Sequence, residues 1–120
     1  MTDAYNQENI NLNAKLFVRQ RVISGAEAAS VVTPQDSAGI VGINTTVVHT
    51  VTLPPATSFP KGFFTRYMCS NATAFNVIFA RTVPDTINLL AADVTIAVNG
   101  GWVLLVSDGN SNWWGFVGGP

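Results

Sequence analysis

The stretch that most constrains the fold covers residues 47–71 and reads VVHTVTLPPATSFPKGFFTRYMCSN. Val47, Val51 and Leu53 fall on one face and Thr46, Thr50 and Thr52 on the other, an alternation that is typical of a half-buried β-strand. Pro54 and Pro55 end that strand, because proline cannot donate a ladder hydrogen bond and restricts the residue before it. A second apolar run, residues 63–69, follows after a short loop. The stretch therefore predicts two strands joined by a proline-rich corner.

The rest of the chain after residue 28 repeats this pattern of short apolar runs separated by Gly, Pro, Asn and Asp turns. Such spacing predicts about eight to ten short strands in a sandwich or barrel. We expect an all-β fold, a compact sandwich or barrel of short antiparallel strands over residues 29–120, and no helix beyond a single turn. The expected strands are 30–33, 40–43, 47–53, 63–69, 73–81, 86–90, 94–98, 102–106 and 113–117.

Two turn signals stand near the end of the chain. Asn99-Gly100 follows an alternating run, and an Asn-Gly pair supplies the positive φ angles of a type I′ turn. It predicts a hairpin between strands 94–98 and 102–106. Asp108-Gly109 predicts a further turn before the last strand.

Residues 1–28 differ from the rest and hold nearly half of the charged side chains. Alternate apolar residues between Ile10 and Val18 fit an extended arm, and the nearby asparagines disfavour a helix. We interpret residues 1–28 as an arm or attachment segment; an ordinary first strand with a frayed terminus is the alternative. The candidate subunit or capsid contacts in it are Leu16, Phe17, Arg19 and Arg21.

The composition is 48% hydrophobic but only 11% charged, well below the usual quarter. This favours burial of part of the surface against other chains, although a Thr/Ser/Asn-rich monomer surface would also be poor in charge. The net charge is −1 with no basic patch, so nucleic-acid binding is not expected. No apolar run is long enough to span a bilayer, and no secretory signal is present, so we expect no membrane partner.

The residue types that carry catalysis are scarce, with one histidine and one cysteine. A His49–Cys69 pair is conceivable, but both residues fall within predicted strands, whereas catalytic groups more often come from loops. Cys69 is expected to be a buried free thiol. His49 is expected to face the core or a subunit axis, where three copies could hold an ion. We therefore expect no enzyme activity, no catalytic residues, no cofactor and no metal site within one chain.

The three tryptophans, Trp102, Trp113 and Trp114, lie near the end of the chain. Adjacent residues on a strand point to opposite faces, so Trp113 and Trp114 cannot both face one core. An exposed tryptophan suits a subunit contact or a carbohydrate platform. A sandwich covered on both sides would bury both indoles. With His49, the three tryptophans complete the set of candidate contacts.

Four motifs between Val31 and Trp114 together resemble a β-rich module of bacteriophage virion proteins, found in tail fibres and in head decoration or cement proteins. They are VVTPQDSAGIVGIN, TVTLPPATSFPKGFF, NVIFARTVPDTI and VNGGWVLLVSDGNSNWW, and they span about two thirds of the chain. The resemblance implies a virion component, commonly a homotrimer, and it brings no catalytic residues. A tail fibre usually has a long shaft or docking domain, whereas this chain has only a short arm.

The expected function is thus that of a non-enzymatic virion protein, a trimeric capsid decoration or cement protein that stabilises the head shell. Its expected partners are two further copies and the major capsid protein or another virion protein. Assembly is expected in the host cytoplasm, with the virion as the final location. The alternative is a tail-fibre or fibre-tip module that binds a host surface glycan.

Overall fold

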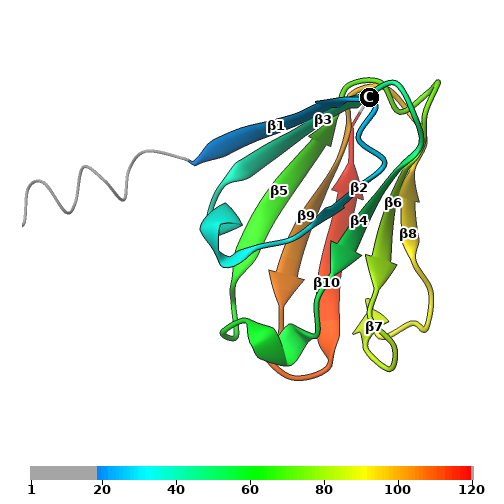
Figure 1. Ribbon diagram of the computed structural model, residues 1–120. Coiled ribbons are helices and arrows are strands. Elements are labelled where there is room, and N and C mark those ends of the chain that lie inside the picture. Colours follow the sequence, from blue (N-terminus) through cyan, green and yellow to red (C-terminus); the bar gives the residue numbers. More distant parts are fainter. Residues whose placement is uncertain (1–18, 120) are drawn as a thin grey trace, which may run out of the picture.

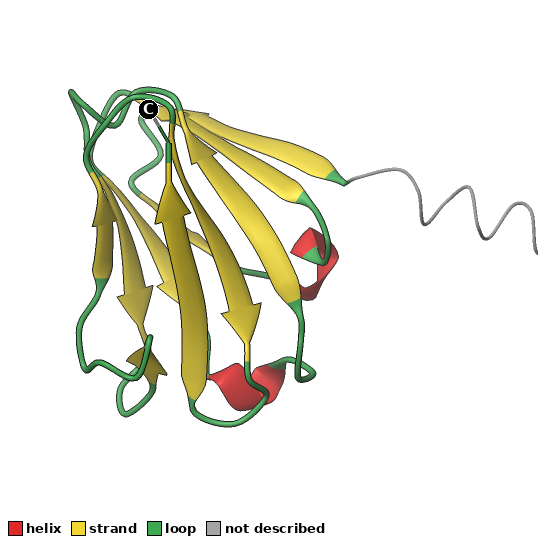
Figure 2. Ribbon diagram, turned by 180° about the vertical axis from the view of Figure 1, so that it is seen from behind, coloured by secondary structure: helices red, strands yellow, loops and turns green. Residues whose placement is uncertain are grey.

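The computed structural model describes residues 19–119, which form two β-sheets packed face to face as a sandwich (Figures 1 and 2). The helices of this part of the chain are two single 3-10 turns, η1 (Pro34–Asp36) and η2 (Ala56–Ser58). The predicted all-β class is confirmed. Residues 1–18 of the predicted arm lie outside the described residues.

Sheet A has six strands and sheet B has four. In spatial order, sheet A contains β1 (Gln20–Gly25), β3 (Ile40–Thr45), β5 (Phe64–Cys69), β9 (Gly101–Ser107), β10 (Asn112–Gly118) and β7 (Thr86–Ile87). Sheet B contains β2 (Ala29–Val31), β4 (His49–Leu53), β6 (Val77–Arg81) and β8 (Val94–Ile96).

The expectation of an antiparallel sandwich is wrong for most of the strand pairs. The chain crosses to the other sheet after each strand from β1 to β8, and up to β7 each strand enters its sheet from the same end as the strand before it in that sheet (Figure 1). β1, β3 and β5 are consequently parallel, as are β2, β4 and β6, and β7 is parallel to β10. Antiparallel pairing is confined to β5–β9, β9–β10 and β6–β8.

The hairpin predicted at Asn99-Gly100 is also not formed. Gly100 has the expected positive φ of 80°, but the strands on its two sides, β8 and β9, belong to different sheets. The turn therefore crosses between the sheets. The antiparallel hairpin of this region is β9–β10, whose turn starts at Asp108, as the second turn signal predicted.

The space between the sheets is filled by the inward-facing residues of both. Aromatic rings fill the end of this space near η2. The ring centroids of Phe59, Phe63 and Trp113 are 4.5 to 6.1 Å apart. Tyr67 and Phe79 meet edge to face at 5.3 Å across the sandwich. T-shaped pairs of this kind add packing energy beyond the area that they bury.

Residues 19–28 are part of this domain, so no break in the fold marks the predicted boundary at residue 28. β1 pairs with β3 along its whole length, and Ile23 is buried in the core with an exposed fraction of 4%. The description of an ordinary first strand fits this part of the segment.

Candidate interaction surface

The outer face of sheet A is apolar across five strands, and we call it the A face. Strand alternation places every second residue of each strand on this face, and the strand register aligns those residues in rows. One row reads Trp114–Val106–Phe64, and the next reads Phe116–Leu104–Arg66–Ile40–Gln20. A third row reads Gly118–Trp102–Met68–Gly42–Val22.

Large side chains on the A face are exposed to solvent. Phe116 is 55% exposed, Phe64 45%, Trp114 38% and Met68 36%. With about 4.8 Å between strands and about 3.3 Å per residue, five strands of six residues cover roughly 500 Å². This lies within the range of the largest apolar patches on monomeric proteins, about 300–600 Å², and such patches are often functional.

Arg66 supplies the charge at the centre of the A face. Its guanidinium lies over the Trp102 ring at 5.1 Å from the centroid. In this cation–π arrangement the face of the ring attracts the positive charge. Gly118 lies beside the same ring, so closely that a Cβ at this position would be 2.3 Å from a ring carbon. Trp102 is therefore held flat and half-buried between Arg66 and the end of β10.

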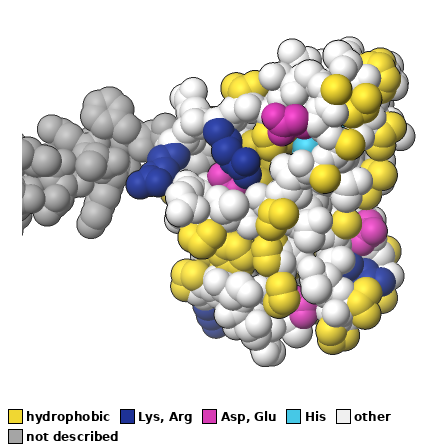
Figure 3. All heavy atoms as spheres, viewed as in Figure 1, with side chains coloured by type: hydrophobic (Ala, Val, Ile, Leu, Met, Phe, Trp, Pro, Cys, Tyr) yellow, Lys and Arg dark blue, Asp and Glu magenta, His cyan; other side chains and the backbone are white. Residues whose placement is uncertain are grey.

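The outer face of sheet B has a different character. Its register aligns Thr50 with Ile78 and Thr95, and Thr52 with Ala80. None of these side chains is charged, and none is aromatic. Figure 3, in the view of Figure 1, shows charged side chains of both signs among scattered hydrophobic ones. The aromatic apolar surface thus belongs to sheet A.

The adjacent tryptophans separate as strand alternation requires. Trp113 is fully buried, and its indole N–H donates to the Pro54 carbonyl at 3.0 Å. Trp114 lies on the A face. Of the predicted contact residues, Trp102 and Trp114 are thus brought together on one surface, while Trp113 belongs to the core.

His49 faces the core, one of the two places predicted for it. It has no exposed surface, and its Nδ1 and Nε2 lie 2.8 Å from the Glu27 carbonyl and the Ser30 hydroxyl. A neutral imidazole that donates from Nδ1 and accepts at Nε2 satisfies both contacts. The ring therefore has no free nitrogen to offer to an ion or a partner.

Cys69 is a buried free thiol, as predicted. Burial raises the pKa of this thiol to about 11, so it is protonated at neutral pH. A reactive cysteine needs the opposite shift, toward the thiolate. The surroundings of Cys69 therefore do not activate its thiol as a nucleophile.

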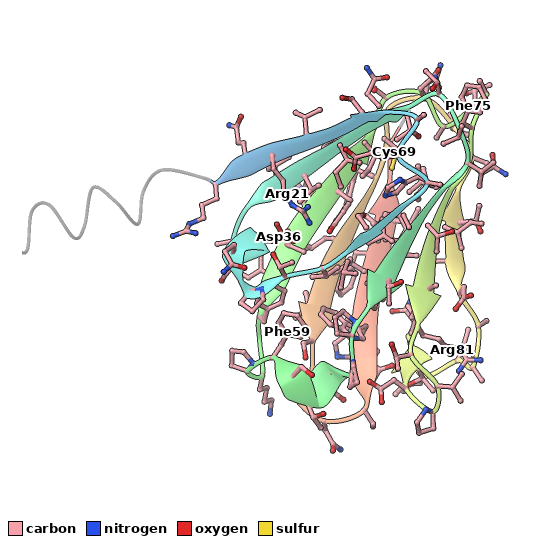
Figure 4. The ribbon with its side chains drawn as sticks, in the orientation of Figure 1. Arg21, Asp36, Phe59, Cys69, Phe75 and Arg81 are labelled. Atoms are coloured by element: carbon pink, nitrogen blue, oxygen red, sulfur yellow. The ribbon has the colours of Figure 1, made fainter. Side chains whose placement is uncertain are left out.

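Arg21 is engaged within the chain (Figure 4). Its Nε and Nη2 donate to the two carboxylate oxygens of Asp36 at 2.8 and 2.9 Å, and Asp36 also accepts the Thr33 N–H. The hydrogen bond to Asp36 raises the pKa of the Arg21 guanidinium. This bidentate pair ties β1 to η1 and leaves Asp36 without a free oxygen for acid–base chemistry.

Arg19 is exposed at the start of β1 and borders a hollow of about 370 Å³. Ile40 also lines it, together with Gln20, Gln35 and the Arg21–Asp36 pair. Leu16 and Phe17, the other predicted contacts of this segment, lie outside the described residues.

Sequence reasoning missed most residues of the A face, among them Phe64, Arg66, Met68 and Phe116. A signal exists for those of β5 and β9, because the runs FTRYMC and WVLLV carry apolar residues at both alternating sets of positions. A strand with one face exposed to solvent carries apolar residues at only one of the two alternating sets of positions. The two-sided pattern therefore indicates strands that are covered on both sides.

Between residues 19 and 119, no group of three His, Cys, Asp or Glu side chains is arranged to hold a metal ion. The same residues include no helix of the length and hydropathy needed to cross a bilayer. No known protein family matches the sequence, and no curated protein matches it.

Proposed function

We propose that this chain is a non-enzymatic structural protein of a bacteriophage virion, a homotrimeric decoration or cement protein that reinforces the head shell. The observation that carries the proposal is the A face, a broad apolar sheet surface with a single charged side chain near its centre. The four virion-module motifs, which include residues of both β9 and β10, supply the assignment to a virion.

The chemistry of the A face favours a protein contact. Its exposed groups are aromatic rings, aliphatic chains and the sulfur of Met68, and these gain free energy when another apolar surface removes them from water. Aromatic residues, Met and Arg are also the residue types enriched in the centres of protein interfaces. The trimer contact is therefore assigned to the A face, with Trp102 and Trp114 in it.

The second candidate is a fibre-tip module that binds a host surface glycan, and exposed Trp114 is the observation that favours it. An indole can stack on a sugar ring, but a sugar also needs polar groups that bond its hydroxyls. The row of Trp114 continues with Val106 and Phe64, which offer none. The apolar neighbours of Trp114 place this candidate second.

The mass of the full-length protein in solution, measured by light scattering behind a sizing column, tests the self-association. We expect a trimer. Phe116→Asp should lower the mass, because it places a charge in the contact. Thr95→Asp is the matched control, since it places the same charge on the outer face of sheet B. Equal masses for both variants would exclude the A face as the trimer contact.

Co-sedimentation with capsids that lack decoration proteins tests the virion role. We expect saturable binding of the full-length protein to the shells. Saturable binding to host polysaccharide with no binding to shells would reverse the order of the two candidates. Absence of both would reject the virion role in either form.

A further inference from the structure

The open edge of β1 leaves room for a further strand to pair with sheet A. β1 is the outermost strand of sheet A, and its other neighbours in that sheet lie on the β3 side (Figures 1 and 2). Two hydrogen bonds fix which of its backbone groups face β3: Ile40 N–H to the Arg19 carbonyl, and Thr46 N–H to the Gly25 carbonyl. In a parallel ladder alternate residues bond to the same side, so residues 19, 21, 23 and 25 bond to β3.

The N–H and C=O groups of Gln20, Val22 and Ser24 consequently point to the open edge, where no other described strand lies. Val22 is 72% exposed. The other sheet ends of the described structure are shorter: β2 and β8 have three residues each and β7 has two. β1 has six residues and no proline, lysine or bulge that would discourage pairing.

Part of the other long edge, that of β10, is already closed. Beyond β7, the side-chain amide of Asn88 imitates a neighbouring strand: its Oδ1 accepts the Gly115 N–H at 2.8 Å, and its Nδ2 donates to the Gly115 carbonyl at 3.0 Å. An asparagine thus covers one edge of sheet A, and nothing comparable covers the edge of β1 among residues 19–119.

We propose that residues 10–18 of a second copy add as a strand to this open edge of β1. Their sequence, INLNAKLFV, alternates apolar and polar residues over most of its length, as an added strand should. At about 3.3 Å per residue, nine residues span about 30 Å, which exceeds the length of β1. The proposal rests on the self-association stated above and gives it a second contact.

The sequence between the two strands argues for a second copy as the donor. A hairpin with the same chain's β1 needs a tight turn, which Gly, Asn, Asp or Pro residues supply. Residues 14–23, AKLFVRQRVI, contain none of these. A segment that cannot turn back onto its own β1 can pair with the β1 of a neighbour.

The two faces of the docked segment match their surroundings. The A face reaches β1 at Val22, so the apolar set of residues 10–18 would extend it. The asparagines and Lys15 would then lie on the opposite side, where β1 carries Arg21 paired with Asp36.

Proline substitutions in the full-length protein test this pairing. Val22→Pro removes an N–H that faces the open edge and keeps those that bond to β3. Leu12→Pro interrupts the donor segment. The matched controls are Val22→Thr, which keeps the N–H, and Thr2→Pro, which lies outside the donor segment. We expect the two test variants to lose oligomer mass by light scattering and both controls to keep it.

Amide hydrogen exchange at Val22, followed by NMR, gives a second readout. Protection in the wild type that Leu12→Pro abolishes and Thr2→Pro preserves supports strand addition. Because Leu12 lies outside the described fold, this comparison remains informative even where Val22→Pro disturbs folding. An unprotected Val22 amide in the oligomer overturns the proposal, and so does protection in a protein that light scattering shows to be a monomer.

The outcomes also separate this inference from the proposed function. An oligomer that keeps its mass in both proline variants but loses it in Phe116→Asp rejects strand addition and leaves the A face contact intact. Loss of binding to capsid shells alone bears on the virion role and not on the pairing.

Discussion

At the scale of single residues, the Arg21–Asp36 pair holds the start of β1 in place. Removing Arg21 leaves the Asp36 carboxylate, which is 4% exposed, with the Thr33 N–H as its hydrogen-bond donor. Because Arg21 itself is 39% exposed, the cost falls below that of breaking a fully buried pair. We expect Arg21→Ala to lower the free energy of unfolding by about 1–3 kcal/mol in urea at pH 7. Arg19→Ala, at an exposed neighbour, should change it by less than about 0.5 kcal/mol; equal effects would contradict this role of the pair.

Cys69 gives a prediction at high pH. Burial raises its pKa from an ordinary value near 9 to about 11, so the folded state holds the proton more tightly than the unfolded state. The stabilisation is complete below about pH 9 and is lost as the pH rises toward 11. Urea unfolding curves between pH 8 and 11 should therefore show a steeper loss of stability in the wild type than in Cys69→Ala. Parallel curves would show that the thiol ionises equally easily in both states.

Several single-residue assignments could be made from the sequence because strand alternation settles them. The opposite orientations of Trp113 and Trp114 follow from adjacency alone, and the burial of Cys69 follows from its apolar run. Alternation puts His49 on the same side of its strand as Val51, facing either the core or a subunit axis, but it does not reveal the two hydrogen-bond partners of the ring. Glu27 and Ser30 come from the connection before β2 and from β2 itself, about twenty residues away in sequence.

At the scale of elements, the β9–β10 hairpin depends on Asp108. Its Oδ1 accepts the N–H groups of Asn110, Ser111 and Asn112 at 2.8 to 3.0 Å. We expect Asp108→Ala to lower the free energy of unfolding by about 1 kcal/mol in urea, because three turn N–H groups lose their acceptor to solvent. Asn110→Ala, in the same turn, is the control, and a comparable loss there would indicate a general effect of the turn.

The same residue predicts an acid dependence. Burial alone would raise the pKa of the Asp108 carboxyl, but the three backbone hydrogen bonds and the charge of Lys61 outweigh it and lower the pKa. A lowered pKa contributes stability that is present above the unfolded value near 4 and is lost as the pH falls below it. The wild type should lose stability below pH 4 more steeply than Asp108→Ala in chemical denaturation. Identical slopes would argue that the turn hydrogen bonds do not depend on the charge.

The existence of most strands could be read from the sequence, but their pairing could not. Alternation tells which residues of a strand face inward, and Pro54 and Pro55 tell where β4 ends. Neither tells which sheet the next strand joins. Asn99-Gly100 illustrates the difference, because Gly100 has the expected positive φ whereas Asn99 does not, and the chain crosses to the other sheet at this turn. The parallel order follows from these crossings, which leave no local sequence signal.

At the scale of the whole molecule, low charge content favours a surface that other chains cover, but it does not tell where on the fold such a surface would lie. The A face emerges only when β1, β3, β5, β9 and β10 are aligned side by side, and three of these neighbour relations join strands far apart in sequence. The domain boundary shows the same limit. The segment before residue 28 differs in composition, yet its residues 20–25 belong to sheet A through pairing with β3.

The apolar character of the A face also predicts how the assembly responds to salt. Contacts held by exposed ion pairs weaken as ionic strength rises, because dissolved ions screen the charges. The Debye screening length is about 10 Å at 0.1 M and shortens as salt is added. Burial of apolar surface is not screened, and excluded salts such as sulfate strengthen it. Arg66, stacked on Trp102, is the charge at the centre of the face. We therefore expect the oligomer mass measured by light scattering to stay constant or rise between 0.05 and 1 M sodium sulfate.

Phe116→Asp is the internal reference for this titration, since its added carboxylates make the contact repulsive. Screening of that repulsion should restore part of its oligomer mass as the salt concentration rises. A wild-type assembly that instead dissociates with salt would show that charged groups, and not the A face, hold the copies together.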